Sequence, residues 1–166
     1  MLTQFNILKD RLGNPEYLYL VLEPLALYGL FFGLLFLGAS LMLKQDKARM
    51  IALFFIALSS VSVVPYLHQR EIAQRRLMVV RDAGYTRLME KHTRLRNDTK
   101  WVNYSLAGLA LLAMIGKGKI ASIAHAALFI GGLLALGFFL WLHLKESEIY
   151  HPNLRKAMAA VSTVRQ

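Results

Sequence analysis

The chain alternates between long blocks almost free of charge and short segments in which charged residues crowd together. The apolar blocks occupy 17–43, 50–67, 101–115 and 120–144. A helical block of about 18 or more uncharged residues matches the hydrocarbon thickness of a bilayer. The pattern therefore predicts an all-α integral membrane four-helix bundle. Composition agrees, because 56% of residues are hydrophobic and 18% charged, against about 45–50% and 25% in soluble domains.

The first and third blocks depart from the ideal length in opposite directions. Asn14 followed by Pro15 is typical of a helix start, and a helix from there to the end of the first block would measure about 43 Å. Since the hydrocarbon core is about 30 Å thick, this helix must tilt, kink or begin outside it. Pro24 is the expected kink. The short third block is completed by interfacial Trp101 and by snorkelling of Lys117.

Two polar segments lie outside the predicted spans. The segment 68–100 holds nine Lys and Arg residues, and its pattern predicts helices interrupted at Gly84. The polar tail 145–166 is expected to begin as a helix and to break at Pro152. The fold is therefore a single membrane domain with a partly helical, basic extramembrane segment.

The distribution of basic residues predicts the orientation. With four spans, both termini and the segment 68–100 share one side and carry fifteen Lys and Arg residues, whereas the turns 44–49 and 116–119 carry five. The positive-inside rule then places both termini in the cytoplasm, with a bacterial inner membrane as the expected location. Because the net charge of +10 flanks apolar blocks, anionic lipid is the expected partner rather than nucleic acid. The absence of cysteine excludes disulfides and c-type haem attachment.

Small residues recur at helical spacing within two of the blocks. Gly29 and Gly33 form a GxxxG pair in the first, and Ala127, Gly131 and Ala135 form a ladder in the fourth. Small residues let helix backbones approach closely in a membrane. The favoured interpretation is packing inside the bundle, and the alternative is docking against another subunit.

Histidines gather toward one predicted membrane face. His68 ends the second span, His92 precedes the third and His143 ends the fourth. Two of the three could be the axial ligands of a b-type haem, which takes imidazoles from two helices. The simpler interpretation is that they are interfacial anchors. His125 lies about one turn inside the opposite face.

Glu23 is the ionisable residue in the middle of an apolar block. Such a residue is costly and by default marks a functional position. Two roles remain open: it starts a helix and accepts backbone N–H groups there, or it carries a proton or binds a ligand. In the second case its expected partner is His68, His143 or an arginine of the segment 68–100.

The span layout resembles a family of uncharacterised four-helix bacterial membrane proteins, some of them suspected of binding b-type haem. Members often open the first span with a His-Pro and a His-Phe-Pro element and place a histidine just before the third. Here the corresponding positions are Asn14-Pro15, Glu23-Pro24 and His92. The resemblance implies the same four-helix architecture, with both first-span histidines replaced.

The motifs of self-contained enzymes are missing: there is no P-loop, HExxH, GxSxG or dinucleotide-binding glycine pattern. The leading hypothesis is a small non-catalytic transmembrane subunit of a larger complex, in respiratory or photosynthetic electron transfer, that packs against other membrane subunits. The first alternative is a b-type cytochrome that uses two of His68, His92 and His143. The second is a small transporter or proton-handling protein centred on Glu23.

Overall fold

The computed structural model describes residues 2–78 and 83–151, and all regular structure within these ranges is helical. The helices in chain order are α1 (Leu2–Leu12), α2 (Pro15–Met42), α3 (Asp46–Val61), α4 (Val63–Met78), α5 (Ala83–Asp98), α6 (Lys100–Ile115) and α7 (Gly118–Tyr150). The all-α prediction is confirmed.

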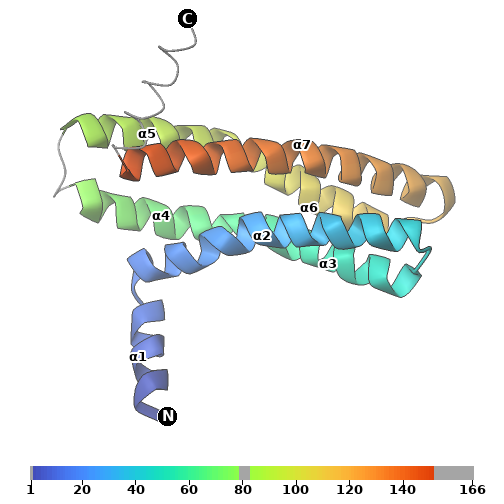
Figure 1. Ribbon diagram of the computed structural model, residues 1–166, viewed down its shortest axis with the longest axis horizontal. Helices are drawn as coiled ribbons and strands as arrows, with labels where there is room; N and C mark the ends of the chain where they lie inside the picture. Colours follow the sequence, from blue (N-terminus) through green and yellow to red (C-terminus); the bar gives the residue numbers. More distant parts are fainter. Residues whose placement is uncertain (1, 79–82, 152–166) are drawn as a thin grey trace, which may run out of the picture.

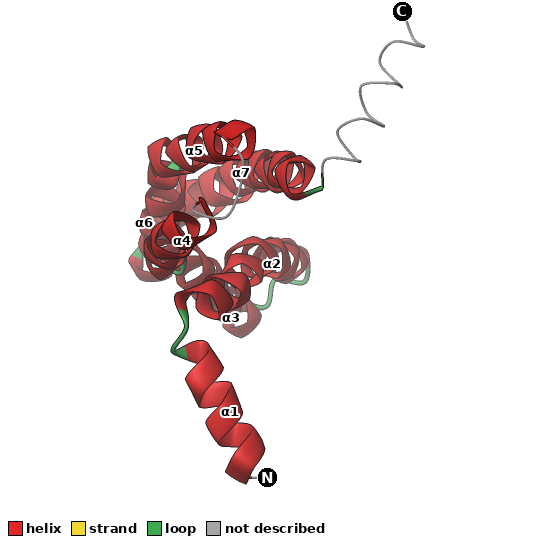
Figure 2. Ribbon diagram, turned by 90° about the vertical axis from the view of Figure 1, so that its left-hand side faces the viewer, coloured by secondary structure: helices red, strands yellow, loops and turns green. Residues whose placement is uncertain are grey.

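The helices form an elongated molecule with two unlike halves. Helix α4 follows α3 almost directly, and α6 follows α5 in the same way, while α2 and α7 extend along much of the molecule (Figure 1). One half contains α3, α6 and the apolar parts of α2 and α7. The other half contains α4, α5 and the remaining ends of α2 and α7. Helix α1 projects away from both (Figure 2).

Three helical segments are long and apolar enough to cross a membrane: Leu20–Met42, Asp46–Arg75 and Gly118–Tyr150. The first, second and fourth blocks therefore form helices of the predicted length and apolar character, which is consistent with integration in a membrane. The predicted third span lies in α6, which has 16 residues and a length of about 24 Å. It is shorter than the other three because charged residues end the apolar run on both sides.

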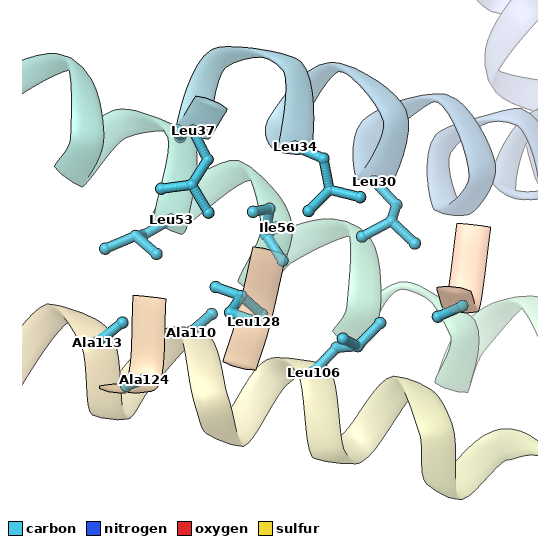
Figure 3. Packing of buried hydrophobic residues seen from close by; sticks show 12 residues of the cluster. Leu30, Leu34, Leu37, Leu53, Ile56, Leu106, Ala110, Ala113, Ala124 and Leu128 are labelled. Atoms are coloured by element: carbon cyan, nitrogen blue, oxygen red, sulfur yellow. The ribbon is translucent and has the colours of Figure 1, made fainter. Parts of the chain in front are cut away.

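The apolar half is held together by leucine and alanine side chains that converge from four helices (Figure 3). They recur three or four positions apart, which places each set on one helix face. The principal members are Leu30, Leu34 and Leu37 of α2, Leu53 and Ile56 of α3, Leu106, Ala110 and Ala113 of α6, and Ala124 and Leu128 of α7. Large apolar side chains on the outer faces are exposed, as expected for a surface that faces lipid.

The GxxxG pair of the first span closes α2 onto α3. A Cβ atom added to Gly29 would lie 2.7 Å from the Cβ of Ser59, and one added to Gly33 would lie 2.6 Å from the Cγ1 of Ile56. Cβ atoms in real proteins essentially never come this close to another atom, so a larger residue at either position would force the helices to shift. These glycines therefore serve internal packing, as the favoured interpretation held.

The small residues of α7 behave differently from the predicted ladder. Ala135 is buried, but Ala127 is exposed, and a Cβ added to Gly131 would meet nothing within 4 Å. The neighbouring Gly132 faces the core, where an added Cβ would lie 2.6 Å from the Cδ2 of Leu34. The close approach on α7 is thus one residue away from the predicted position, because the rotation of a helix is fixed by its packing partners.

The first long helix agrees with its sequence pattern. Helix α2 begins at Pro15, as predicted, and contains Pro24. It bends in its N-terminal half, where Pro24 lies (Figure 1). Glu23 lies inside this helix, so the interpretation of Glu23 as a helix start is wrong. The start signal at Asn14 and Pro15 is nine positions earlier and is the one that the chain uses.

The segment 68–100 and the polar tail are helical where the structure describes them. Helix α4 continues the second span to Met78, and α5 is described from Ala83, so Gly84 lies inside α5 and is not a break there. The residues 79–82 lie outside the described ranges. Helix α7 continues to Tyr150, which confirms that the tail begins as a helix. Its predicted break at Pro152 lies outside the described residues.

Candidate functional site

The second half of the molecule has a charged core. Six ionisable side chains from four helices, called the charged cluster below, lie together there: Glu23 of α2, Arg70 of α4, His92 and Arg96 of α5, and His143 and Glu146 of α7. Residues three or four positions apart share a helix face. His92 and Arg96, like His143 and Glu146, therefore reach the cluster from the same side of their helix.

Arg70 and Glu146 form the centre of the cluster. Their side chains are 1% and 4% exposed, respectively. The Nη1 atom of Arg70 donates hydrogen bonds to the Tyr66 hydroxyl at 2.8 Å and to Oε2 of Glu146 at 3.1 Å. Its Nη2 lies 2.8 Å from Oε1 of Glu146, an ion pair without hydrogen-bond alignment. Two such buried charges lose much hydration, and close pairing offsets that loss.

Arg96 connects this pair to the first span. Its Nη2 donates to Oε2 of Glu146 at 2.7 Å and to Oε1 of Glu23 at 3.2 Å. The same Glu23 oxygen accepts a hydrogen bond from Nδ1 of His143 at 3.2 Å. Since the side chain of His143 is 43% exposed, the chain of polar contacts runs from the buried Arg70 to a side chain that reaches solvent or headgroups.

His92 is held in one tautomer by its two neighbours. A backbone carbonyl can only accept, so Nε2 donates to the Leu142 carbonyl oxygen at 3.0 Å. A guanidinium can only donate, so Nδ1 accepts from Nη2 of Arg70 at 3.1 Å. Burial lowers the pKa of His92 below its ordinary 6.5; Glu146 opposes this effect, and Arg70 adds to it. His92 is therefore neutral.

The arginines and glutamates of the cluster balance one another in charge. Arg70 and Arg96 face Glu23 and Glu146, and the neutral His92 adds none. A cavity of about 40 Å³ lies beside Glu23, Arg96 and His143. A cavity of this size has room for roughly one to three water molecules. The arrangement can hold the four helices in place, and its more exposed residues, Glu23 and His143, can exchange protons. The cavity is too small for an organic substrate.

Two of the three predicted haem ligands belong to the cluster, and one does not. The structure brings His92 and His143 to it, together with Glu23, and places His68 on an exposed face of α4. Both ring nitrogens of His92 have partners, so iron ligation would require one of these contacts to break. Across the described ranges, no group of three or more His, Cys, Asp or Glu is placed to hold a metal ion.

Glu23 has two of the partners that its sequence position predicted, His143 and an arginine of the segment 68–100. The residues that sequence reasoning missed are Arg70 and Glu146, the most deeply buried pair. A signal was available for Arg70, because Tyr66 four positions before it and Ala73 three positions after it place it on a less polar helix face. Glu146 had a weaker one, because it follows His143 by three positions on α7.

The outer surface of the segment 68–100 is less basic than its sequence. Two of the nine cations are withdrawn from that surface, because the side chains of Arg70 and Arg96 are 1% and 14% exposed and contact Glu146. A groove of about 590 Å³ between α4 and α5 has three carboxylates and two guanidinium groups in its walls, from Glu71, Glu90, Asp98, Arg75 and Arg94. This surface therefore has mixed charge.

No protein-family model, curated protein or solved structure matches the chain. Function is therefore inferred from the chemistry of the described residues.

Proposed function

We propose that this protein is a small non-catalytic membrane subunit that holds a rigid helical platform at one membrane face for a partner protein. The platform consists of α4, α5 and the C-terminal part of α7. The observation that carries the proposal is the internal pairing of the charged cluster, which ties these helices to one another and to α2. Groups that are committed to one another in this way stabilise an arrangement of helices rather than bind a substrate.

In this proposal α6 is the fourth membrane helix. Its residues Leu106, Ala110 and Ala113 belong to the same apolar core as the three long helices. Trp101 at its beginning is 65% exposed, as suits an aromatic ring at the interface. Lys117, just after its end, can snorkel to the opposite surface. A local thinning of the bilayer accommodates the remaining mismatch.

We place both termini in the cytoplasm on the basis of the charge asymmetry. The beginning of α2 and the end of α7 lie at the same end of the molecule (Figure 1), which supports a shared side for the termini. Reporter fusions after the C-terminus and within the turn 116–119 test this orientation. An active cytoplasmic reporter in the turn and an inactive one at the C-terminus would reverse the assignment.

The subunit proposal is tested by gentle extraction of native membranes followed by native electrophoresis with detection of this chain. We expect a band well above the mass of a dimer that contains additional stoichiometric polypeptides. Glu146→Gln, which unbalances the cluster, should release the chain from that assembly, whereas Asp10→Asn, an exposed charge change on α1 outside the platform, should not. A monomer or homodimer without other polypeptides would contradict the proposal.

A second function, proton handling, is supported by one observation. The half-exposed His143 contacts Glu23, and Glu23 leads through Arg96 to the buried Glu146. This path is tested in liposomes with a pH-sensitive dye inside. Proton flux that depends on the protein and disappears in Glu23→Gln would support it, and equal flux in both proteins would exclude a role for Glu23. An absorption spectrum of the purified chain tests the b-type cytochrome alternative in the same preparation.

A further inference from the structure

A pocket at the opposite end of the molecule from the charged cluster combines one arginine with a buried histidine nitrogen that has no hydrogen-bond partner. It measures about 480 Å³ and lies where the end of α2 meets the beginnings of α3 and α7. Its walls are formed by Leu41, Arg49, Gly118, Ala121, Ser122, His125 and Ala126. The cluster residues contribute nothing to it.

The position of the pocket places it at the surface of a membrane. All three candidate spans have an end here, at Met42, Asp46 and Gly118. Arg49 lies three residues after Asp46, or about 5 Å along its helix, and His125 lies seven residues after Gly118, or about 10 Å along its helix. The pocket therefore lies at the depth of lipid headgroups and the uppermost part of the acyl chains.

The charge at this end is strongly positive. The turns and helix starts around the pocket contain five cations, Lys44, Lys47, Arg49, Lys117 and Lys119, against the single carboxylate of Asp46. Arg49 pairs with Asp46 at 3.0 Å, but that carboxylate side chain is 87% exposed, and an exposed pair of this kind is weak. The buried Nε of Arg49 has no hydrogen-bond partner. Because the pair with Asp46 is exposed and weak, the guanidinium can bind a second anion beside it.

His125 supplies a second, different contact. It is 8% exposed, and its Nδ1 is hydrogen-bonded to the Ala121 carbonyl oxygen. A carbonyl only accepts, so Nδ1 carries the proton, and Nε2 of the neutral ring is an acceptor. That Nε2 is buried and has no partner. A buried acceptor without a donor is costly. A hydroxyl group would satisfy it once a small shift of the His125 ring opens Nε2 to the pocket that this residue lines.

We propose that this pocket binds the headgroup of an anionic phospholipid that carries a hydroxyl, such as phosphatidylglycerol. The phosphate lies on Arg49, within reach of the Ser122 hydroxyl, and a headgroup hydroxyl donates to Nε2 of His125. The surrounding lysines attract the anionic lipid and add no specificity. The acyl chains continue along the exposed apolar surface of the neighbouring spans. A lipid explains the pairing of a cation with a hydroxyl acceptor at headgroup depth better than a soluble anion does.

Native mass spectrometry of the full chain in detergent tests the proposal with three lipids of matched acyl chains. Phosphatidylglycerol has both groups, phosphatidylmethanol has the charge without the hydroxyl, and phosphatidylcholine is zwitterionic. We expect apparent affinity to fall in that order. Arg49→Gln should weaken phosphatidylglycerol binding by about five- to tenfold and leave phosphatidylcholine unchanged. Arg87→Gln, an exposed cation at the other end, is the matched control.

The hydroxyl contact has its own test in His125→Phe, which keeps a ring of similar shape without the acceptor. This variant should bind phosphatidylglycerol and phosphatidylmethanol equally well. If this variant does not fold, the native chain still tests the contact. Equal affinity of the native chain for phosphatidylglycerol and phosphatidylmethanol would overturn the hydrogen bond to His125. Equal losses in Arg49→Gln and Arg87→Gln would overturn the site. Binding of soluble glycerol phosphate as tight as that of the lipid would overturn the assignment to a membrane lipid.

Discussion

Replacing Glu146 with glutamine leaves Arg70 charged, 1% exposed and without the carboxylate that pairs with it. The charged cluster, balanced in the native protein, then carries one excess positive charge. Breaking a buried ion pair by removing one partner typically costs about 3–5 kcal/mol. For a chain of this length each kcal/mol corresponds to roughly 2–4 °C in the unfolding midpoint. We therefore expect Glu146→Gln to lower that midpoint by about 10 °C.

The same reasoning predicts that the partner mutation partly restores stability. Arg70→Gln alone leaves one excess negative charge, whereas the double mutant leaves Arg96 opposite Glu23 and is balanced again. The loss in the double mutant should thus be smaller than the sum of the two single losses by about 1–3 kcal/mol. Thermal unfolding in detergent, followed by the fluorescence of Trp101 and Trp141, measures all three variants.

An exposed acid provides the control for this cycle. Glu90→Gln on α5 removes a surface carboxylate and should change stability by no more than about 0.5 kcal/mol. If Glu146→Gln unfolded at the same temperature as Glu90→Gln, the buried pair would contribute nothing to stability. Strict additivity of Arg70→Gln and Glu146→Gln would show that charge balance is not what holds the cluster together.

Three further predictions follow from burial and packing. Since the pKa of His92 is lowered in the folded chain, the unfolded chain binds more protons just below pH 6.5, and the free energy of unfolding should fall as pH falls through that region. His92→Gln should flatten this pH dependence, and exposed His68→Gln should not. Gly33→Ala should cost about 1–3 kcal/mol through overpacking, whereas Gly131→Ala should be neutral or stabilise by up to about 1 kcal/mol, as denaturation in mixed micelles would show. Glu23→Gln should destabilise less than Glu146→Gln in the same assay, because its side chain is 16% exposed and the arginine it pairs with keeps a second carboxylate.

The sequence predicted the helices, three segments long and apolar enough to span a membrane and the helix start at Pro15, because these features depend on local properties. Hydropathy over about twenty residues and the chemistry of one Asn-Pro pair are sufficient for them. Alternation of spans also predicted that Glu23, His92 and His143 would share one end of the molecule. That prediction needs only the direction of each helix and the depth of each residue.

The tertiary structure alone decided which side chains face one another. Arg70 and Glu146 are 76 residues apart, and in the sequence Arg70 resembles the other cations of a basic segment. Its burial depends on how α4 is rotated against α5 and α7, and rotation is set by packing along the whole helix. The same holds for Gly132 rather than Gly131 at the close approach to α2. It holds too for the pocket that joins Arg49 to His125, because that pocket exists only where three helix ends meet. The length and polarity of a segment specify that it is a helix and how deep it lies in the membrane. The rotation of that helix about its own axis is set only when the bundle assembles.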